Sequence, residues 1–367
     1  MTILVVAEFY PRGGTYSAVT KLLRLNKELG YDQILLIQKK MLFPELENYC
    51  DHLGIELRIC PDRPPVMQIP LLSLFYDWLL QFFYIRNIQH DIIVVSNSHS
   101  WMLIGMFGFK SNSILYLTHS YPNRYLHFFF SPLYILTANL DHNKKFVTVS
   151  EYAKKVNVNY LKLDSENIDV IHNSFASELI QNDPNINGNV VLTVGRINPI
   201  KNPNVWLAVA SMVSRNIDSV KFIWVGGDEN QMNKMNANVK KYPGLASHVE
   251  IVGYTYDLFR YYKQASIYFQ PSLSENHSIA VIDAMAAGLP CIVSNVGGML
   301  ESVVGNETGF MCGTSDIEGF SEKISRLMFD KKLARKLGDS GRKRAQKLFS
   351  EETQKKKLKS IYKLIST

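Results

Sequence analysis

The sequence lacks most features of membrane-spanning, disulfide-bonded and dinucleotide-binding proteins. Its four cysteines form no C-x-x-C pair and no cluster with histidine, so we interpret them as reduced core thiols. No uninterrupted apolar run reaches the roughly 20 residues that span a bilayer, because Asp77 and Gln81 interrupt the longest candidate at 69–85. There is no G-x-G-x-x-G fingerprint of dinucleotide binding, and no signal peptide separates Met1 from the first apolar strand. We therefore expect a cytoplasmic protein.

Length and composition indicate a globular chain. The 367 residues suffice for two domains of ordinary size, and 46% of them are hydrophobic and 20% charged. The net charge of +7 is uneven: residues 331–367 hold 13 lysines and arginines against three acids, so they carry +10 and residues 1–330 carry −3. This basic segment is either a solvated helix face or a surface for the anionic inner leaflet of the membrane. We expect no nucleic-acid partner, because no recognised binding motif accompanies the charge.

Short apolar runs alternate with helical patterns, which is typical of doubly wound parallel α/β sheets. In the first half we expect strands at 3–7, 33–37, 55–59, 92–95, 114–117 and 146–149. In the second half we expect strands at 190–194, 221–225, 249–252, 265–269 and 291–293. Residues 173–189 are rich in asparagine with little periodicity, which predicts a linker between domains at 1–172 and 190–349. Ligands of such sheets bind beyond the carboxyl ends of the strands.

The stretch 274–295 is the most informative on function. It reads as a loop, a helix, a tight turn and a strand, with Glu275 just before the helix and Asp283 about two turns inside it. Between them the helix start offers free backbone N–H groups and a positive dipole end, which suit a phosphate. The order fits a nucleotide sugar, with sugar hydroxyls at Glu275, the diphosphate at the helix start and ribose hydroxyls at Asp283. The alternative is a surface helix with two solvated acids.

Two loops that follow predicted strands could also hold a phosphate. Gly13 and Gly14 follow the first strand and let the backbone approach a ligand closely, although an ordinary turn explains them equally well. Arg196 and Lys201 follow the strand at 190–194. An arginine fork and a lysine point charge five residues apart make a good diphosphate clamp.

Two histidines and two aromatic stretches stand out in the first half. His99 and His119 follow the fourth and fifth predicted strands, either as structural hydrogen-bonding residues or as part of a site. Residues 71–85 and 121–137 are aromatic and apolar. We expect most of these side chains in the core, and the alternative for a minority is an exposed surface for a lipid-linked acceptor or a membrane.

These motifs together resemble the retaining glycosyltransferases of the GT-B architecture, glycosyltransferase family 4. The family's E-x7-E motif stands here as Glu275-x7-Asp283, within a run that continues Asp-Ala-Met-Ala-Ala-Gly-Leu-Pro, and its G-R-…-K-N element stands at 195–202. The resemblance covers essentially the whole chain and is strong over 190–312. It implies two Rossmann-like doubly wound domains facing a central cleft, with residues 350–367 crossing back to the first domain.

The resemblance also implies site residues. The expected catalytic residues are Glu275 and His119, the latter beside the donor sugar. The expected donor-binding residues are Gly13, Gly14, Arg196, Lys201, Asn276, Ser278, Ile279, Ala280, Val281 and Asp283. Two residues depart from the family pattern: Asp283 replaces a glutamate, and Glu351 replaces the tryptophan of the F-S-W sequence at the crossover.

The implied reaction moves a sugar, with retention of configuration, from a nucleotide-diphosphate sugar to a hydroxyl of a glycan or lipid-linked acceptor. Uridine is the family's commonest base, and bacterial surface polysaccharide or lipopolysaccharide is the expected product. The chain has no D-x-D motif, so we expect no metal and no cofactor, with Arg196, Lys201 and the helix start supplying the positive charge. Two alternatives remain open: a nucleotide-sugar epimerase or hydrolase on the same fold, and a non-catalytic partner subunit, which the two departures would favour.

Overall fold

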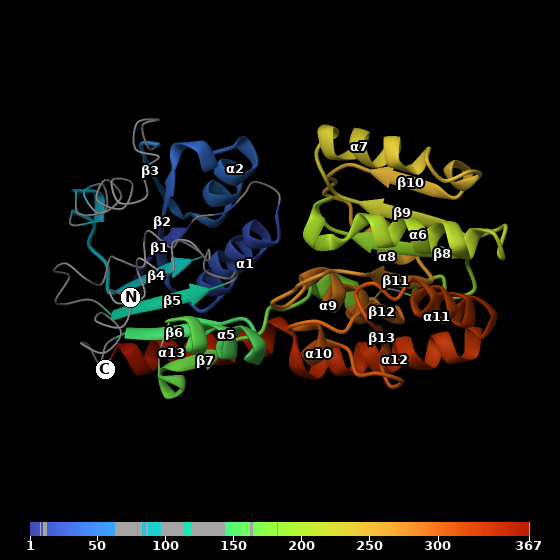
Figure 1. Ribbon diagram of the computed structural model, residues 1–367. Helices are drawn as coiled ribbons and strands as arrows, with labels where there is room; N and C mark the ends of the chain where they lie inside the picture. The colour runs from blue at the N-terminus through green and yellow to red at the C-terminus, as the bar shows by residue number, and fades with distance from the viewer. Residues whose placement is uncertain are drawn as a thin grey trace. The chain divides into compact units, whose positions relative to one another are not determined.

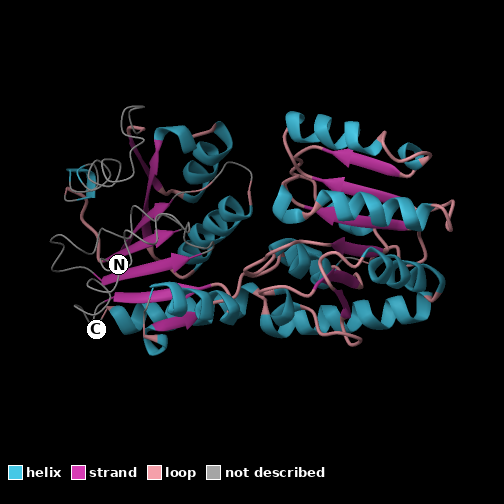
Figure 2. Cartoon of the chain, viewed as in Figure 1, coloured by secondary structure: helices cyan, strands magenta, loops and turns pink. Residues whose placement is uncertain are grey.

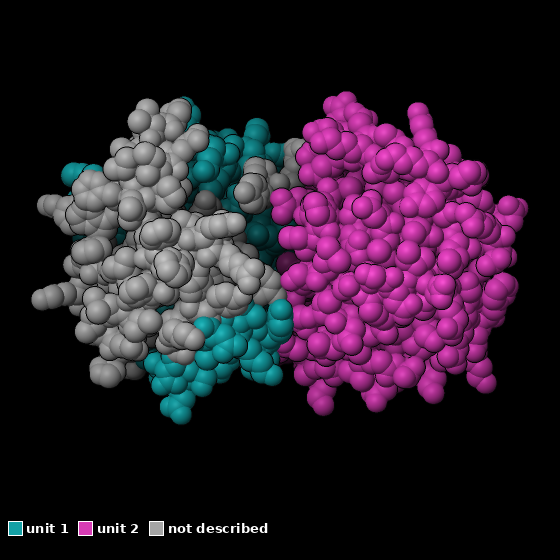
Figure 3. Space-filling view, viewed as in Figure 1, with its two compact units in different colours: residues 1–171, 354–367 teal, residues 172–353 magenta. Residues whose placement is uncertain are grey.

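The computed structural model describes residues 1–7, 9, 13–62, 79, 83–85, 87–96, 113–118, 144–161, 164–181 and 183–366. The chain forms two compact units, one of residues 1–171 with 354–367 and one of residues 172–353 (Figure 3). Each unit contains a parallel sheet with helices packed against it (Figure 2). The prediction of two doubly wound α/β domains is therefore confirmed.

The first unit contains a seven-stranded sheet. Its strands are Thr2–Ala7 (β1), Asp32–Gln38 (β2), Glu56–Cys60 (β3), Ile92–Ser96 (β4), Ser113–Thr118 (β5), Lys144–Thr148 (β6) and Ile168–Val170 (β7). They are arranged in the order β3-β2-β1-β4-β5-β6-β7. Its helices are Gly14–Glu28 (α1), Pro44–Leu53 (α2), Glu151–Leu161 (α5) and, from residue 354 on, Glu351–Ile365 (α13).

Helix α13 packs one apolar face into the core of the first unit. Leu358, Ile361, Tyr362 and Ile365 are buried and recur at helical spacing. The Tyr362 hydroxyl donates to Oδ1 of Asn26 on α1 over 3.0 Å, so the one polar atom that this face buries is satisfied. The cluster that receives the helix includes core residues of β1 and β2.

The second unit contains a six-stranded sheet. Its strands are Val190–Val194 (β8), Lys221–Val225 (β9), Val249–Val252 (β10), Ile267–Gln270 (β11), Cys291–Ser294 (β12) and Gly309–Cys312 (β13). Its helices are Pro203–Ser214 (α6), Glu229–Val239 (α7), Phe259–Gln264 (α8), Ile279–Ala286 (α9), Met299–Ser302 (α10), Ile317–Phe329 (α11) and Lys331–Leu348 (α12). Helix α6 packs against α11, and α9 packs against α12 (Figure 1).

The strand order of the second unit, β10-β9-β8-β11-β12-β13, reverses direction between β8 and β11. These two strands are hydrogen-bonded neighbours, with Val191 opposite Ile267. Loops that leave such a pair at the carboxyl edge run in opposite directions, which opens a crevice where ligands of doubly wound sheets bind. The loops after Val194 and Gln270 are therefore the places to look for a site in this unit.

The asparagine-rich segment 173–189, which we predicted as a linker, lies within the second unit. Phe175, Leu179 and Ile186 are each at most 4% exposed and belong to its hydrophobic core. The backbone N–H of Phe175 also donates to the carbonyl of Phe349 over 3.1 Å. Three apolar residues anchor the segment, and a short 3-10 helix, Ser177–Gln181, carries one of them, Leu179.

Candidate functional site

The loop after β8 is shaped by two glycines with positive φ. Gly195 has φ +150°, and a Cβ there would lie 3.3 Å from Cε of Lys201, so the lysine stem runs close along the glycine backbone. Gly226 has φ +120°, and a Cβ there would lie 2.6 Å from the Gly195 carbonyl oxygen. Oδ1 of Asn198 accepts the backbone N–H of Lys201 over 3.0 Å and caps the short turn that carries this lysine. The fold thus directs Lys201 back over the end of β8.

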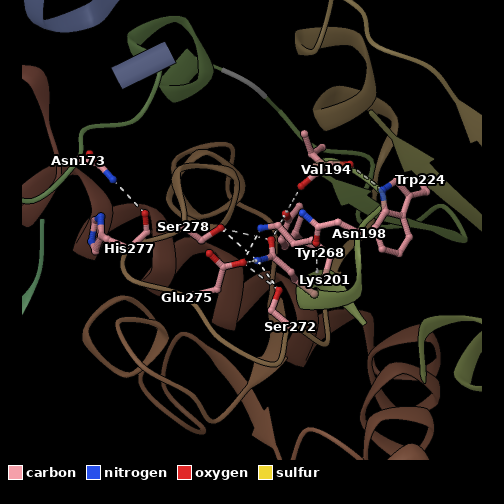
Figure 4. A network of polar contacts seen from close by, with 12 residues as sticks. Asn173, Val194, Asn198, Lys201, Trp224, Tyr268, Ser272, Glu275, His277 and Ser278 are labelled. Carbon is pink, nitrogen blue, oxygen red and sulfur yellow. Dashed lines mark hydrogen bonds and ion pairs between the residues drawn. The ribbon is translucent and has the colours of Figure 1, made fainter. Parts of the chain in front are cut away.

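Lys201 meets Glu275 from the loop after β11. The Lys201 Nζ atom lies 2.5 Å from Oε1 of Glu275, and the two side chains are 18% and 13% exposed (Figure 4). A charged pair that is largely shielded from water interacts more strongly than one on the surface. The cation predicted for phosphate and the carboxylate predicted for sugar hydroxyls therefore form one centre at the switch point of the sheet.

The Glu275 carboxylate is held by one of its two oxygens. Besides Lys201, Oε1 accepts from Nε2 of Gln270 and from Oγ of Ser272, each over 2.9 Å. Oε2 has no hydrogen-bond partner within the described part of the chain. In Figure 4 one oxygen of Glu275 meets the dashed contacts and the other points away from them. Oε2 is the oxygen available to a ligand.

A second pair of glycines braces the loop that carries Glu275. The Gly298 N–H donates to the Glu275 carbonyl over 2.9 Å. A Cβ on Gly298 would lie 1.6 Å from the Asn276 carbonyl oxygen, so only glycine permits this approach. The adjacent Gly297 has φ +51°, in the left-handed region that favours glycine. The glycine pair that the sequence places after the motif thus shapes the site without contributing a side chain.

Helix α9 begins at Ile279, four residues after Glu275, so Asp283 lies in its second turn rather than two full turns inside it. Ile279 and Ala280 are partly exposed residues, whereas Val281 is buried. Ser278 precedes the helix but makes no capping hydrogen bond, because its hydroxyl contacts Gln270 instead. The helix start remains a suitable anion site next to the lysine–glutamate centre.

Asp283 has a contact that the spacing did not predict. Its Oδ1 accepts the backbone N–H of Ala176 over 2.8 Å, and the residue is 8% exposed. Ala176 belongs to the segment predicted as a linker, so the second carboxylate of the motif anchors that segment to α9. Its predicted contact with a ribose stays a prediction.

The other predicted residues are distributed between the two units. Arg196 is exposed on the loop after β8. Gly13 precedes α1 in the first unit and Gly14 begins that helix. A Cβ on Gly14 would meet no described atom within 4 Å, so packing does not explain the glycine. His119 and His99 lie outside the described residues, as do all of 121–137 and most of 71–85.

Sequence reasoning missed four polar residues around the site: Tyr268, Gln270, Ser272 and His277. Gln270 and Ser272 donate to the Glu275 carboxylate, and Tyr268 donates to Gln270. In the sequence, the signal for this network was a glutamine at the end of a strand that is mostly apolar. The fourth, His277, is 5% exposed, and neither ring nitrogen has a hydrogen-bond partner in the described structure.

The His277 ring packs between two aromatic neighbours. The ring centroids of His172 and Phe349 each lie 5.0 Å from its own. Nε2 of His172 lies 3.1 Å from Oε2 of Glu301. Burial lowers the pKa of His277 to about 3; His172 adds to this shift and Glu301 opposes it. His277 is therefore neutral at physiological pH.

The described residues contain no group of three or more His, Cys, Asp or Glu side chains placed to hold a metal ion. None of the described helices combines the length and the apolar character that crossing a membrane requires.

Comparison with known proteins shows what the chain resembles. Residues 176–344 match the family model "Glycosyl transferases group 1". Over 234 residues the chain is 26% identical to the capsular polysaccharide biosynthesis glycosyltransferase CapM of Staphylococcus aureus, covering 62% of this chain and 58% of that protein. Over 149 residues it is 32% identical to an Escherichia coli UDP-Gal:alpha-D-GlcNAc-diphosphoundecaprenol alpha-1,3-galactosyltransferase, covering 40% of this chain and 38% of that protein. The matches thus span about half the length of these relatives.

Solved structures extend the likeness to the whole chain. A glycosyltransferase from Rickettsia africae ESF-5 superposes with a TM-score of 0.79 at 20% identity, covering 99% of this chain and 98% of that one. Anabaena Alr3699/HepE, solved in complex with UDP-glucose, gives a TM-score of 0.78 at 15% identity, covering 99% of both chains. The predicted GT-B fold and the resemblance to group 1 glycosyl transferases are confirmed, the latter over residues 176–344, while retention and membership of family 4 stay predictions.

Proposed function

We propose that this group 1 glycosyl transferase moves a sugar, with retention of anomeric configuration, from a UDP-sugar to a hydroxyl of a glycan or lipid-linked acceptor. The observation that carries the proposal is the contact between Lys201 and Glu275 at the switch point of the second sheet. It places a cation for a diphosphate and a carboxylate for sugar hydroxyls beside an anion-binding helix start. A nucleotide sugar has the complementary groups in the same order.

Each group has a defined part in the proposed reaction. The start of α9, Lys201 and Arg196 bind the diphosphate and stabilise the charge that develops as the nucleotide leaves with the electrons of the glycosidic bond. Oε2 of Glu275 binds sugar hydroxyls and orients the oxocarbenium-like ring. The acceptor hydroxyl attacks the anomeric carbon on the face that the nucleotide leaves, and its proton passes to a phosphate oxygen. The family resemblance adds His119, Gly13 and Gly14 beside the donor and Asp283 at the ribose.

The names of similar proteins support the donor and the acceptor class. Anabaena Alr3699/HepE was solved with UDP and with UDP-glucose. The E. coli relative is named for transfer from UDP-Gal to a diphosphoundecaprenol-linked sugar, and CapM for capsular polysaccharide biosynthesis. We therefore place this chain in the synthesis of a bacterial surface polysaccharide or lipopolysaccharide, in the cytoplasm at the inner face of the membrane.

The basic helix α12 supports the membrane part of the proposal. Lys332, Lys336, Lys343 and Lys347 are exposed and spaced 4, 7 and 4 residues apart, which places them on one face of the helix. We call these four residues the α12 lysine stripe. Asp339, the single acid on this helix, is also exposed and lies within the stripe, three residues after Lys336 and four before Lys343, so the stripe carries a net charge of +3. The stripe suits the anionic surface of the inner leaflet.

We propose that the transfer needs no metal, because Lys201, Arg196 and the α9 start supply the charge that a metal would bring. The test incubates the purified protein with a panel of nucleotide sugars, with and without glycan and undecaprenyl-diphosphate-linked acceptors, and follows the products by mass spectrometry. Transfer that requires an acceptor and survives excess EDTA supports the proposal. Epimer or free sugar formed equally well without acceptor would favour the epimerase or hydrolase alternative, and no product from any donor would favour a non-catalytic subunit.

A further inference from the structure

Strand β11 ends in a buried glutamine, Gln270. Gln270 is 0% exposed, and Ile267 and Phe269 of the same strand are buried apolar residues. A buried primary amide is unfavourable unless its donors and its acceptor are hydrogen-bonded, whereas an apolar residue of similar size would suit this position. The presence of Gln270 therefore calls for an explanation in its contacts.

Every contact of the Gln270 amide leads towards the site. Its Oε1 accepts from the Tyr268 hydroxyl over 2.7 Å, and this hydroxyl is itself fully buried. Its Nε2 donates to Oε1 of Glu275 over 2.9 Å and lies 3.1 Å from Oγ of Ser272 and 3.2 Å from Oγ of Ser278. The carboxylate of Glu275 can only accept, so the amide nitrogen faces it, and the Tyr268 hydroxyl donates to the amide oxygen on the other side. Figure 4 shows Tyr268, Ser272 and Ser278 close to the Glu275 carboxylate.

Lys201 alone cannot keep the carboxylate in place during the proposed reaction. Its ammonium is a point charge on a flexible stem, and a bound diphosphate competes for it with Glu275. Gln270 and Ser272 hold the same Oε1 atom from a buried strand end and its adjoining loop, and neither side chain has a charge for the diphosphate to attract. The carboxylate thus keeps its orientation when Lys201 turns to the phosphate.

We propose that Gln270, held by a hydrogen bond from Tyr268, is a positioning residue that fixes Oε1 of Glu275 so that Oε2 faces the hydroxyls of the donor sugar. The inference rests on the proposed function, because it assigns the sugar subsite to Oε2. It predicts that Gln270 affects the reacting sugar and leaves the binding of the nucleotide portion alone. A purely structural role would instead lower stability and affect both steps together.

The test compares Gln270→Met, which keeps the side-chain volume and removes the amide, with Thr193→Val as a matched control. Thr193 is 1% exposed on the neighbouring strand β8, and its hydroxyl donates to the Phe269 carbonyl and accepts from Nε1 of Trp206, with no contact to Glu275. We expect kcat of Gln270→Met at saturating donor to fall about 10- to 100-fold, while the Kd for UDP, which lacks the sugar, stays within about twofold. Thr193→Val should lower the thermal midpoint and leave kcat unchanged.

Two results would overturn the inference. One is a kcat of Gln270→Met that falls no further than that of Thr193→Val, and the other is a loss of UDP affinity in proportion to the loss of kcat. Failure of the proposed function is a separate outcome, seen as absence of turnover in the wild type with every donor. In that case a crystal structure of Gln270→Met decides: a rotated Glu275 carboxylate supports positioning, and an unchanged one refutes it.

Discussion

The Lys201 ammonium lies 2.5 Å from Oε1 of Glu275, although 74 positions separate the two residues in the chain. The sequence predicts both for donor binding, one at the phosphate and the other at the sugar. The structure places them in direct contact. Each therefore partly neutralises the other until a diphosphate competes for the lysine.

This contact predicts different outcomes for two substitutions of Lys201. Lys201→Met removes the charge for the diphosphate and leaves the Glu275 carboxylate without its cation, so the Kd for UDP should rise about 10- to 100-fold, the range of a charged hydrogen bond. Lys201→Arg keeps the charge and should retain most of the affinity. Titration calorimetry measures both, with Lys234→Met, an exposed lysine on α7, as the control that should bind like wild type. Unchanged affinity of Lys201→Met would remove this residue from the phosphate site.

The carboxylate of Asp283 should have two separable roles. Asp283→Ala leaves the Ala176 N–H without its acceptor, which should lower the free energy of unfolding by about 1–3 kcal/mol. Asp283→Asn should keep most of the wild-type stability, because an amide oxygen can accept this hydrogen bond instead. The ribose role is measured by comparing the binding of UDP with that of its 2′,3′-dideoxy analogue. Wild type should prefer the ribose form and Asp283→Ala should not. If the preference survives in Asp283→Ala, the residue serves only to anchor Ala176.

The buried His277 should make the protein less stable in acid. Its folded-state pKa of about 3 lies below the value near 6.5 of an unfolded histidine. Between pH 6.5 and pH 3 the unfolded chain therefore takes up a proton that the native ring does not. The free energy of unfolding should therefore fall as the pH drops from 6.5 towards 3, by roughly 1.4 kcal/mol per pH unit from this group.

The matched substitution for His277 is phenylalanine, which fits between His172 and Phe349 and cannot titrate. Urea denaturation at pH 7 and pH 5 should show a smaller acid loss for His277→Phe than for wild type. His52→Gln, at an exposed histidine of the first unit, should behave like wild type. An equal acid loss in His277→Phe would show that other groups cause it.

The strands and the main motif could be predicted from the sequence because they are local patterns. Apolar runs of three to five residues give β8 to β12 within about two residues, and the spacing of Glu275 before an apolar helix marks the loop and the start of α9. The contacts of Asp283 with Ala176 and of Gln270 with Glu275 could not be predicted in the same way. They depend on which segments the fold brings together, and a single sequence carries no periodic signal for such pairs.

The α12 lysine stripe should bind anionic vesicles. Replacing Lys332, Lys336, Lys343 and Lys347 with glutamine should weaken co-sedimentation with phosphatidylglycerol vesicles, since each lysine near such a surface contributes about 1 kcal/mol. The control replaces four other exposed lysines of the second unit and so makes the same change in net charge: Lys234, Lys240, Lys241 and Lys263. Binding should also weaken with salt. Equal losses in the two variants would mean that net charge, rather than the stripe, attracts the membrane.

Two other lysines of the basic C-terminal segment are poor choices for that experiment. Lys355 donates to Glu28 over 2.9 Å, a contact that lowers the pKa of this glutamate, and Lys357 donates to the carbonyl of Val170 over 3.1 Å. Both contacts lie within the first unit. Part of the basic excess therefore serves the packing of α13, and only the remainder is available to a partner.

The most direct test of the account is the effect of Glu275→Gln on turnover and on donor binding, measured separately. The variant keeps the side-chain shape and removes the charge that we place at the reacting sugar. With the UDP-sugar that the donor panel identifies, kcat should fall at least about 100-fold while the Kd for UDP changes by less than about threefold. A kcat close to that of wild type, or a Kd that rises in step with the loss of kcat, would contradict the role of Glu275 and with it the assignment of this site.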